Sequence, residues 1–309
     1  MTELGAQAVP WPATLDTAPR GDLYRSSGAT FALDESLPRY VEAKLEVCGE
    51  PWAALVADGA DEDALEACAT RLFEQVHLEQ PTVLEHEGDG WRFPLTGVTV
   101  SSTGAIGLER GAQLEPLGKR IAERARLESG ARARILALAL NVQDDLALMH
   151  RDVAEGLWVM LPSTWNPLEK IGLPLAVIHA PVPNSTTLQN ATPNLTKAVL
   201  ERGPFERFVW TLQGSGALGA HLEHPPRDEG GLYWRIERQT FFPMPDLERY
   251  WFVIRVHVVP LETVLNSERA VALNAALEKI SASLTTHKRL EPLLPRAHAI
   301  LSPYLKVTA

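Results

Sequence analysis

The chain has 309 residues, of which 45% are hydrophobic and 22% charged, a composition typical of a globular protein with a full core. Its net charge of -10 and the absence of any Lys/Arg-rich run argue against a nucleic-acid partner, because phosphate binding needs concentrated positive charge. No stretch reaches the roughly 18 apolar residues that cross a bilayer, and residues 1–19 lack the features of a secretory signal, so we expect no membrane association and a cytoplasmic location.

The first third of the sequence predicts an N-terminal arm followed by covering helices. Residues 1–35 are rich in proline and glycine and lack periodicity, whereas we expect 36–309 to form a single domain with helical extensions. Asp61 is placed to cap a helix over 61–73, in which Leu65, Cys68, Ala69 and Leu72 form one buried stripe. Residues 91–101 read as extended chain.

The middle of the sequence predicts a long helix over residues 131–152. Its apolar positions recur at three- and four-residue steps, at Ile135, Leu138, Val142, Leu146 and Met149. Asp145 lies at the edge of this stripe, so we expect it to pair with an arginine or cap a loop amide; a catalytic role is the less favoured alternative. A short apolar strand is predicted over 157–161.

The last third predicts three strands and two helices. The strands cover 207–213, 232–242 and 250–259, and the last two form a hairpin across a proline-containing loop. The helices cover about 267–284 and 293–301. Antiparallel strands with helices outside them indicate an α+β fold.

His179 is the most informative single residue, because it ends a short apolar helix just before Pro181-Val182-Pro183. Helical spacing places it on one face with Ile171 and Leu175, so its imidazole should point inward. Periodicity alone favours a core histidine over a metal ligand, although an imidazole in such a setting is also how proteins hold haem iron.

The strand over 232–242 separates three further candidates by its alternation. Arg238 and Thr240 fall on the more apolar face, and Glu237 falls on the opposite one. A guanidinium on an apolar face needs an anion, which would be an internal carboxylate, a propionate or an oxyanion. Alternation alone favours the internal ion pair.

The remaining histidines are weaker candidates. His257 falls on the more polar face of the strand over 250–259, so we expect it outside the main core. His221 and His224 flank Glu223 in the loop GAHLEHPP, but their spacing matches no helical metalloprotease pattern. A solvated loop is favoured over a metal site there.

Five runs, taken in order, resemble one family. They are NVQDDLALM (141–149), LPSTWNPLEKIGLPLAVIHAPVP (161–183), RFVWTL (207–212), WRIERQTFF (234–242) and WFVIRVHVVPLE (251–262). Together they resemble the haem-dependent oxidative N-demethylase α-subunit family. The resemblance implies a PAS-like fold, in which a five-stranded antiparallel sheet is flanked by helices, here with additional N- and C-terminal helices. It also implies haem b held through a histidine.

The activity implied by the resemblance is oxidative N-demethylation of a small secondary amine such as dimethylamine, using O2 and releasing formaldehyde. NADPH-derived electrons would arrive through flavin- and iron-sulfur-bearing partner subunits, and a folate-binding subunit would receive the formaldehyde. A haem-binding PAS sensor without turnover is the alternative function, and a structural subunit with an empty pocket is a third.

The resemblance also assigns roles to residues. His179 matches the histidine of the I-H-x-P-V-P motif and would bind the iron. Arg238 would contact a propionate or iron-bound oxygen, Thr240 would line the pocket, and Glu237 is a lower-ranked catalytic candidate. Lys170 and Arg207 are further candidates for pairing with the propionates.

Two positions depart from the family pattern. Asn184-Ser185 stands where relatives have Gly-Tyr, and His287-Lys288 replaces a Tyr-Lys pair, so the substrate pocket is expected to differ.

Overall fold

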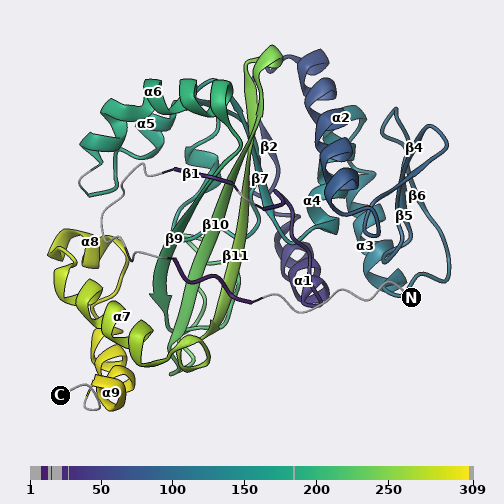
Figure 1. The fold of residues 1–309 in the computed structure, drawn as a ribbon. Coiled ribbons are helices and arrows are strands. Elements are labelled where there is room, and N and C mark those ends of the chain that lie inside the picture. The colour runs from purple at the N-terminus through teal and green to yellow at the C-terminus, as the bar shows by residue number, and fades with distance from the viewer. Residues whose placement is uncertain (1–7, 13–14, 16–22, 27, 184, 306–309) are drawn as a thin grey trace.

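The protein is described by a computed structural model that covers residues 8–12, 15, 23–26, 28–183 and 185–305. It confirms the α+β fold, with two antiparallel sheets and helices packed around them (Figure 1). The strands of the large sheet, in spatial order, are β1 (Tyr24–Arg25), β9 (Phe205–Gln213), β10 (Tyr233–Met244), β11 (Arg249–Pro260), β7 (Asp145–His150), β8 (Val153–Trp158) and β2 (Leu55–Val56). The small sheet contains β3 (Glu85–Glu87), β4 (Gly90–Phe93), β5 (Val98–Val100) and β6 (Ile106–Leu108).

The large sheet has seven strands where five were expected. The five longer strands, from β9 to β8 in spatial order, are adjacent, and the two-residue strands β1 and β2 extend the two edges. The extra strands come from segments that sequence periodicity does not mark, because a two-residue strand is too short to show alternation. The small sheet contains the extended chain predicted over 91–101.

Part of the predicted N-terminal arm is integrated into the fold. β1 pairs with β9, and the side chain of Phe31 is fully buried. The backbone N–H groups of Thr30 and Phe31 each donate to the carboxylate of Glu79, both at 2.8 Å. Residues 30–34 are therefore held against the body of the protein, while the division into an arm over 1–35 and a domain over 36–309 stays a prediction.

The predicted hairpin is confirmed and is longer than expected. β10 and β11 are paired from Tyr233 opposite Pro260 to Met244 opposite Arg249. The connection contains the 3-10 turn Pro245–Leu247, and Glu248 closes it in the left-handed conformation with φ of 53°.

The long helix predicted over 131–152 is wrong in its second half. The helix α4 (Gly130–Asn141) ends where Val142 becomes extended, and β7 begins at Asp145. β7 is buried on both faces, so apolar residues follow one another along it, and a three-residue spacing such as that of Leu146 and Met149 resembles a helical period. The carboxylate of Asp145 accepts a 2.7 Å hydrogen bond from the Leu161 amide, as expected of a loop cap, and pairs with Lys44 rather than an arginine.

Helices cover both faces of the large sheet. On one face lie α5 (Leu175–Ile178) and α6 (Thr186–Arg202), which pack on apolar side chains of β7, β10 and β11 (Figure 1). On the other face lie α1 (Leu37–Val47), α2 (Glu62–Glu79) and α4, with α3 (Glu115–Ala125) and the small sheet beyond them (Figure 1). The buried stripe predicted for 61–73 belongs to this second layer.

The C-terminal helices form a separate cluster beside β9 and β10. The helix predicted over 267–284 is divided into α7 (Ser267–Lys279) and α8 (Ala282–His287), because Ile280 is extended and Ser281 caps the second helix. α9 (Leu294–Leu305) packs against α7, and together they bury Trp210 and Trp234 of the sheet.

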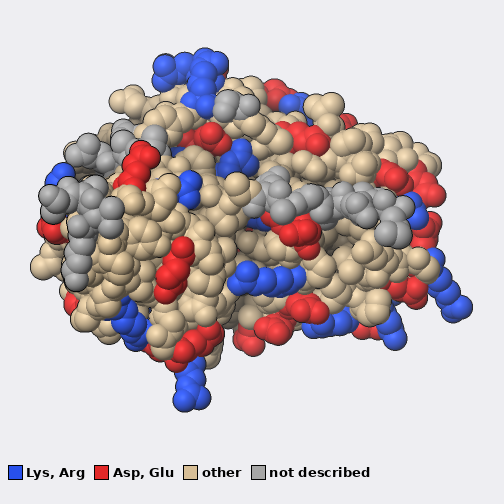
Figure 2. Space-filling view, turned by 60° about the horizontal axis from the view of Figure 1, so that its bottom comes forward, with Lys and Arg blue, Asp and Glu red and all other residues tan. Residues whose placement is uncertain are grey.

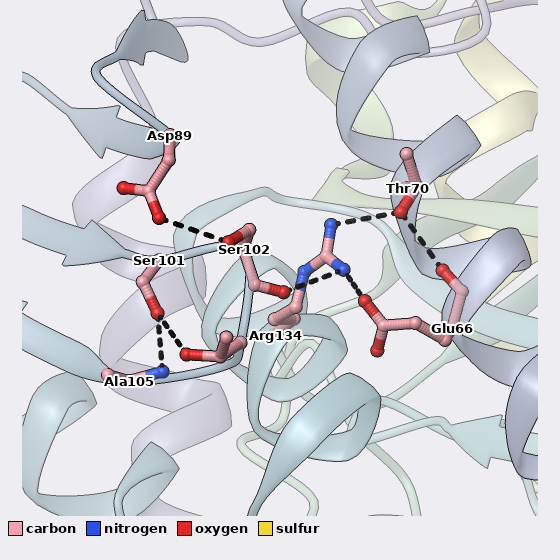
Figure 3. Close-up of polar contacts among 8 residues, drawn as sticks. Glu66, Thr70, Asp89, Ser101, Ser102, Ala105 and Arg134 are labelled. Carbon is pink, nitrogen blue, oxygen red and sulfur yellow. Dashed lines mark hydrogen bonds and ion pairs between the residues drawn. The ribbon is translucent and has the colours of Figure 1, made fainter.

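A polar network joins α2, α4 and the small sheet (Figure 3). Arg134 of α4 is buried, forms an ion pair with Glu66, and donates to Thr70 Oγ1 at 3.2 Å. The same guanidinium reaches the Ser102 carbonyl at 3.4 Å, in the turn after β5, and the Ser102 hydroxyl donates to Asp89. One arginine therefore connects two helices to the small sheet.

Charged side chains of both signs are interspersed on the face drawn in Figure 2, with no extended basic patch there. None of the helices in the described residues has both the length and the apolar character needed to cross a bilayer.

The Asp61 cap gives a stability prediction. Its carboxylate accepts a hydrogen bond from the Ala64 amide at 3.1 Å, at the start of an 18-residue helix. Asp61→Ala should lower the free energy of unfolding by about 1 kcal/mol, because the amide loses its partner at the helix end. Urea unfolding measures this, with Asp58→Ala, an exposed residue nearby, as the control. Equal effects of the two substitutions would contradict the cap.

Buried His257 gives a pH prediction. It is only 8% exposed, contrary to the expectation from sequence, and burial lowers its pKa to about 4, with smaller effects from Arg255, Asp34 and Arg238. Between the ordinary pKa and this lower one, the unfolded chain binds a proton that the folded chain does not, so stability falls as pH falls from about 6.5 to about 4. His257→Asn should lessen the loss of unfolding free energy between pH 7 and pH 5 by roughly 2 kcal/mol. Identical pH profiles in chemical denaturation would show that His257 titrates normally.

Candidate functional site

His179 is positioned by residues 172–175, a short segment (the strap) that is hydrogen-bonded to the start of β8. The amides of Ala154 and Leu175 donate to the carbonyls of Leu173 and Asp152, at 3.0 and 2.7 Å, and Gly172 completes the strap with φ of 74°. Pro174 is the N-cap residue of α5, and His179 is its C-cap residue. The imidazole therefore projects from the end of a short helix whose first turn is hydrogen-bonded to the sheet.

One nitrogen of the His179 imidazole is hydrogen-bonded, and the other has no hydrogen-bond partner among the described residues. Nδ1 lies 2.9 Å from the Leu175 carbonyl oxygen, which can only accept, so Nδ1 carries the proton and Nε2 carries the lone pair. Burial, with smaller contributions from the positive charges of Arg207 and Lys170, lowers the pKa of His179 to about 4, against the opposing effect of the Leu175 bond. A neutral imidazole with a backbone-bonded Nδ1 is the form in which histidine binds a metal through Nε2.

The surroundings of His179 are largely apolar. Side chains from β9, β11, α5, α6 and the preceding loop pack beside a buried cluster that includes Met149, Phe241 and Tyr250. Several of them are only partly buried, namely Trp165, Ile171, Leu175, Ile178, Phe205 and Phe252. This combination of a basic nitrogen and accessible apolar surface suits a flat hydrophobic group such as a porphyrin.

Two cations lie beside His179. Arg207 Nε donates to Gln239 Oε1 at 2.6 Å, while Nη1 and Nη2 have no hydrogen-bond partner among the described residues. Burial lowers the pKa of this guanidinium, and the negative charge of Glu237 opposes that effect. Lys170 follows the 3-10 turn Pro167–Glu169, and its ammonium has no ion pair in the described part of the chain. Both cations are therefore placed to bind an anionic group of a ligand.

Glu237 belongs to the same face of the sheet as Arg207. In the register of β9 and β10, Arg207 lies opposite Gln239, and Glu237 is two residues away in the same row. The Glu237 carboxylate accepts from Gln239 Nε2 at 2.9 Å and from Arg235 Nη2 at 3.3 Å. Its charge also acts on Lys288, whose pKa burial lowers to about 8.

Arg238 and Thr240 lie on the opposite face. Arg238 forms an ion pair with Glu206 at 3.1 Å and donates to the carbonyls of Ala29 and Thr30, at 2.7 and 3.4 Å. The internal ion pair that alternation favoured is therefore present. Thr240 is 1% exposed and lies opposite Glu206 in the register, in the same row as Arg238.

The structure thus divides the predicted site residues into two groups. His179, Lys170, Arg207 and Glu237 are connected through α5 and the face of the sheet beneath it, and Arg238 with Thr240 is separated from them by the sheet. Gln239 joins the first group and was missed from sequence, although it shares its alternation row with Glu237. Ser185 is buried at the start of α6, and Asn184 is outside the described residues.

Comparison with known proteins identifies the family. No curated protein matches the chain. The family model described as haem-dependent oxidative N-demethylase, alpha subunit-like, matches residues 29–297, which include the whole of the site around His179. The resemblance inferred from the sequence motifs is therefore confirmed, and the chain belongs to the haem-dependent oxidative N-demethylase α-subunit-like family.

Proposed function

We propose that the chain binds haem b through Nε2 of His179 and oxidatively demethylates a small secondary amine such as dimethylamine. The observation that carries this proposal is the His179 imidazole, which is neutral, hydrogen-bonded at Nδ1 and open at Nε2 in apolar surroundings. Haem, when bound, would supply the iron that activates O2. The proposal includes a PAS-like fold, which the five adjacent antiparallel strands flanked by helices support.

The charges near His179 support an anionic ligand group. Without haem, Arg207 and Lys170 both disfavour a third positive charge at His179. Haem carries two propionates, and pairing them with these cations would give each a partner, since neither has an ion pair among the described residues. Arg207 is well suited to this role, because Gln239 orients Nε and leaves both terminal nitrogens for a carboxylate.

Glu237 is the candidate of choice for contacting the amine. A secondary amine is a cation at neutral pH, and Glu237 places a carboxylate on the His179 face of the sheet. Gln239 and Arg235 hold that carboxylate in position. We assign Arg238 and Thr240 a structural role on the opposite face, because Glu206 and two backbone carbonyls already bind the Arg238 guanidinium.

The proposed reaction also requires partners. NADPH-derived electrons would come from a flavin- and iron-sulfur-bearing subunit, and a folate-binding subunit would take up the formaldehyde. The α-subunit-like description of the family supports such an assembly.

The iron ligand is tested by absorption spectroscopy of the haem-supplemented protein. His179→Gly should lose the Soret maximum of the wild type, and added imidazole should restore it by occupying the vacated position. His298→Ala, at an exposed position on α9, should leave the spectrum unchanged. A wild-type spectrum in His179→Gly without imidazole would exclude this ligand, and a wild-type chain that takes up no haem would overturn the proposal.

The role of Glu237 is tested by formaldehyde release with NADPH, a compatible reductase and dimethylamine. Glu237→Gln should keep the haem spectrum and lower kcat/KM by roughly ten- to a hundredfold, the effect of losing a hydrogen bond to a charged group. Thr240→Val, on the other face, is the matched control and should retain activity. The reverse ranking would return the catalytic role to the Arg238 face. Amine binding without sustained O2 consumption in the wild type would instead identify a haem-binding sensor.

A further inference from the structure

A second cluster of ligand-type side chains lies in the loop between β9 and β10. The loop is fixed at Ala220, whose amide donates to the Pro162 carbonyl at 2.8 Å and whose carbonyl accepts from the Thr164 amide at 2.7 Å. The next residue, His221, is only 4% exposed, whereas Glu223 and His224 are exposed. The expectation of a solvated loop is therefore wrong for His221 and right for the other two.

The three side chains converge because the loop turns sharply after His221. The His224 amide donates to the His221 carbonyl at 3.2 Å, which brings the two imidazole rings into a stack with centroids 5.6 Å apart. One ligand atom from each of His221, Glu223 and His224 lies within 4.8 Å of the others. Two atoms bound to one tetrahedral Zn²⁺ at about 2.0–2.1 Å are about 3.3–3.4 Å apart, so the exposed side chains of Glu223 and His224 would have to rotate toward His221 to close the set.

His221 is an incompletely satisfied buried imidazole. Nδ1 has one long contact, from the Glu223 amide at 3.3 Å, and Nε2 is buried with no partner among the described residues. The ring is held in place by Trp52, which stacks on it with centroids 4.3 Å apart. A buried polar atom without a partner costs about 1–3 kcal/mol. A metal ion would give Nε2 a partner, with the ring proton then on Nδ1 in place of the long contact from the Glu223 amide.

Glu223 is also oriented from outside the cluster. Asn166 Nδ2 donates to Glu223 Oε1 at 3.2 Å, which leaves Oε2 as the second carboxylate oxygen. Asn166 is itself buried and caps the 3-10 turn that precedes Lys170. Hydrogen bonds that orient a ligating carboxylate in this way are typical of protein metal sites.

We infer that His221, Glu223 and His224 bind one divalent transition-metal ion of the Zn²⁺ class, with water at the remaining positions. Two imidazole nitrogens and one carboxylate oxygen suit Zn²⁺ better than Mg²⁺ or Ca²⁺, which prefer oxygen ligands alone. The ion would cross-link residues 221–224 within the β9–β10 loop, which Asn166 contacts through Glu223. The site shares no residue with the proposed haem site, and its existence does not depend on that proposal.

Isothermal titration of EDTA-treated full-length protein with ZnCl2 tests the site. We expect one Zn²⁺ per chain, with affinity reduced by about tenfold or more in Glu223→Gln and His224→Ala, as loss of a ligand predicts. Both substitutions change exposed side chains, so the fold should survive, and a thermal melt of the metal-free variants checks this. His298→Ala is the control for adventitious binding to a surface histidine and should bind as the wild type does.

Two results would overturn the inference. One is the absence of saturable Zn²⁺ binding to the wild type. The other is binding that Glu223→Gln and His224→Ala leave unchanged, because the ion would then lie elsewhere. His221→Ala should abolish Zn²⁺ binding, but it also removes the ring stacked on Trp52. The variants at the two exposed positions, Glu223 and His224, are therefore the decisive test.

Discussion

The pairing of β10 with β11 over twelve residues is the constraint on which the rest of the structure depends. These strands occupy the middle of the large sheet, and their two-residue period assigns every side chain to one of two covered faces. Glu237 and Gln239 consequently lie on the face that α5 and α6 cover. Arg238 and Thr240 lie on the opposite face, where Arg238 contacts residues 29–30 and Glu206. A shift of one residue in this register would exchange the two groups.

The face with His179 combines a neutral imidazole, two cations and partly buried apolar rings. Each feature alone has an ordinary structural explanation, but together they place two cations that have no ion pair among the described residues beside partly buried apolar side chains. An anionic, flat and hydrophobic cofactor would match both the positive charge and the apolar surface. The family assignment is consistent with this physical need, and the helix-end geometry of His179 explains how the chain would meet it.

On the other face, two arginines are paired with groups of the chain itself. Arg238 uses Glu206 and backbone carbonyls, and Arg255 pairs with Asp34 at 2.7 Å. The bonds from Arg238 to the carbonyls of Ala29 and Thr30 and the Arg255–Asp34 pair attach the segment that follows β1 to the sheet. The Arg238 guanidinium is thus engaged by groups of its own chain, and buried charges need such pairing.

Local patterns in the sequence determined much of the fold: the α+β class, the Asp61 cap, the β10–β11 hairpin and the inward position of His179. Each depends on neighbouring residues, through capping, alternation or helical spacing. Periodicity failed at Leu146 and Met149, because a strand buried on both faces has no polar side to distinguish it from a helix. Only the tertiary structure decided that Glu237, rather than Arg238, shares a face with His179, and that His221 is buried against Trp52. Those relations join segments far apart in the chain, and they follow from strand register and layer packing, which no local pattern records.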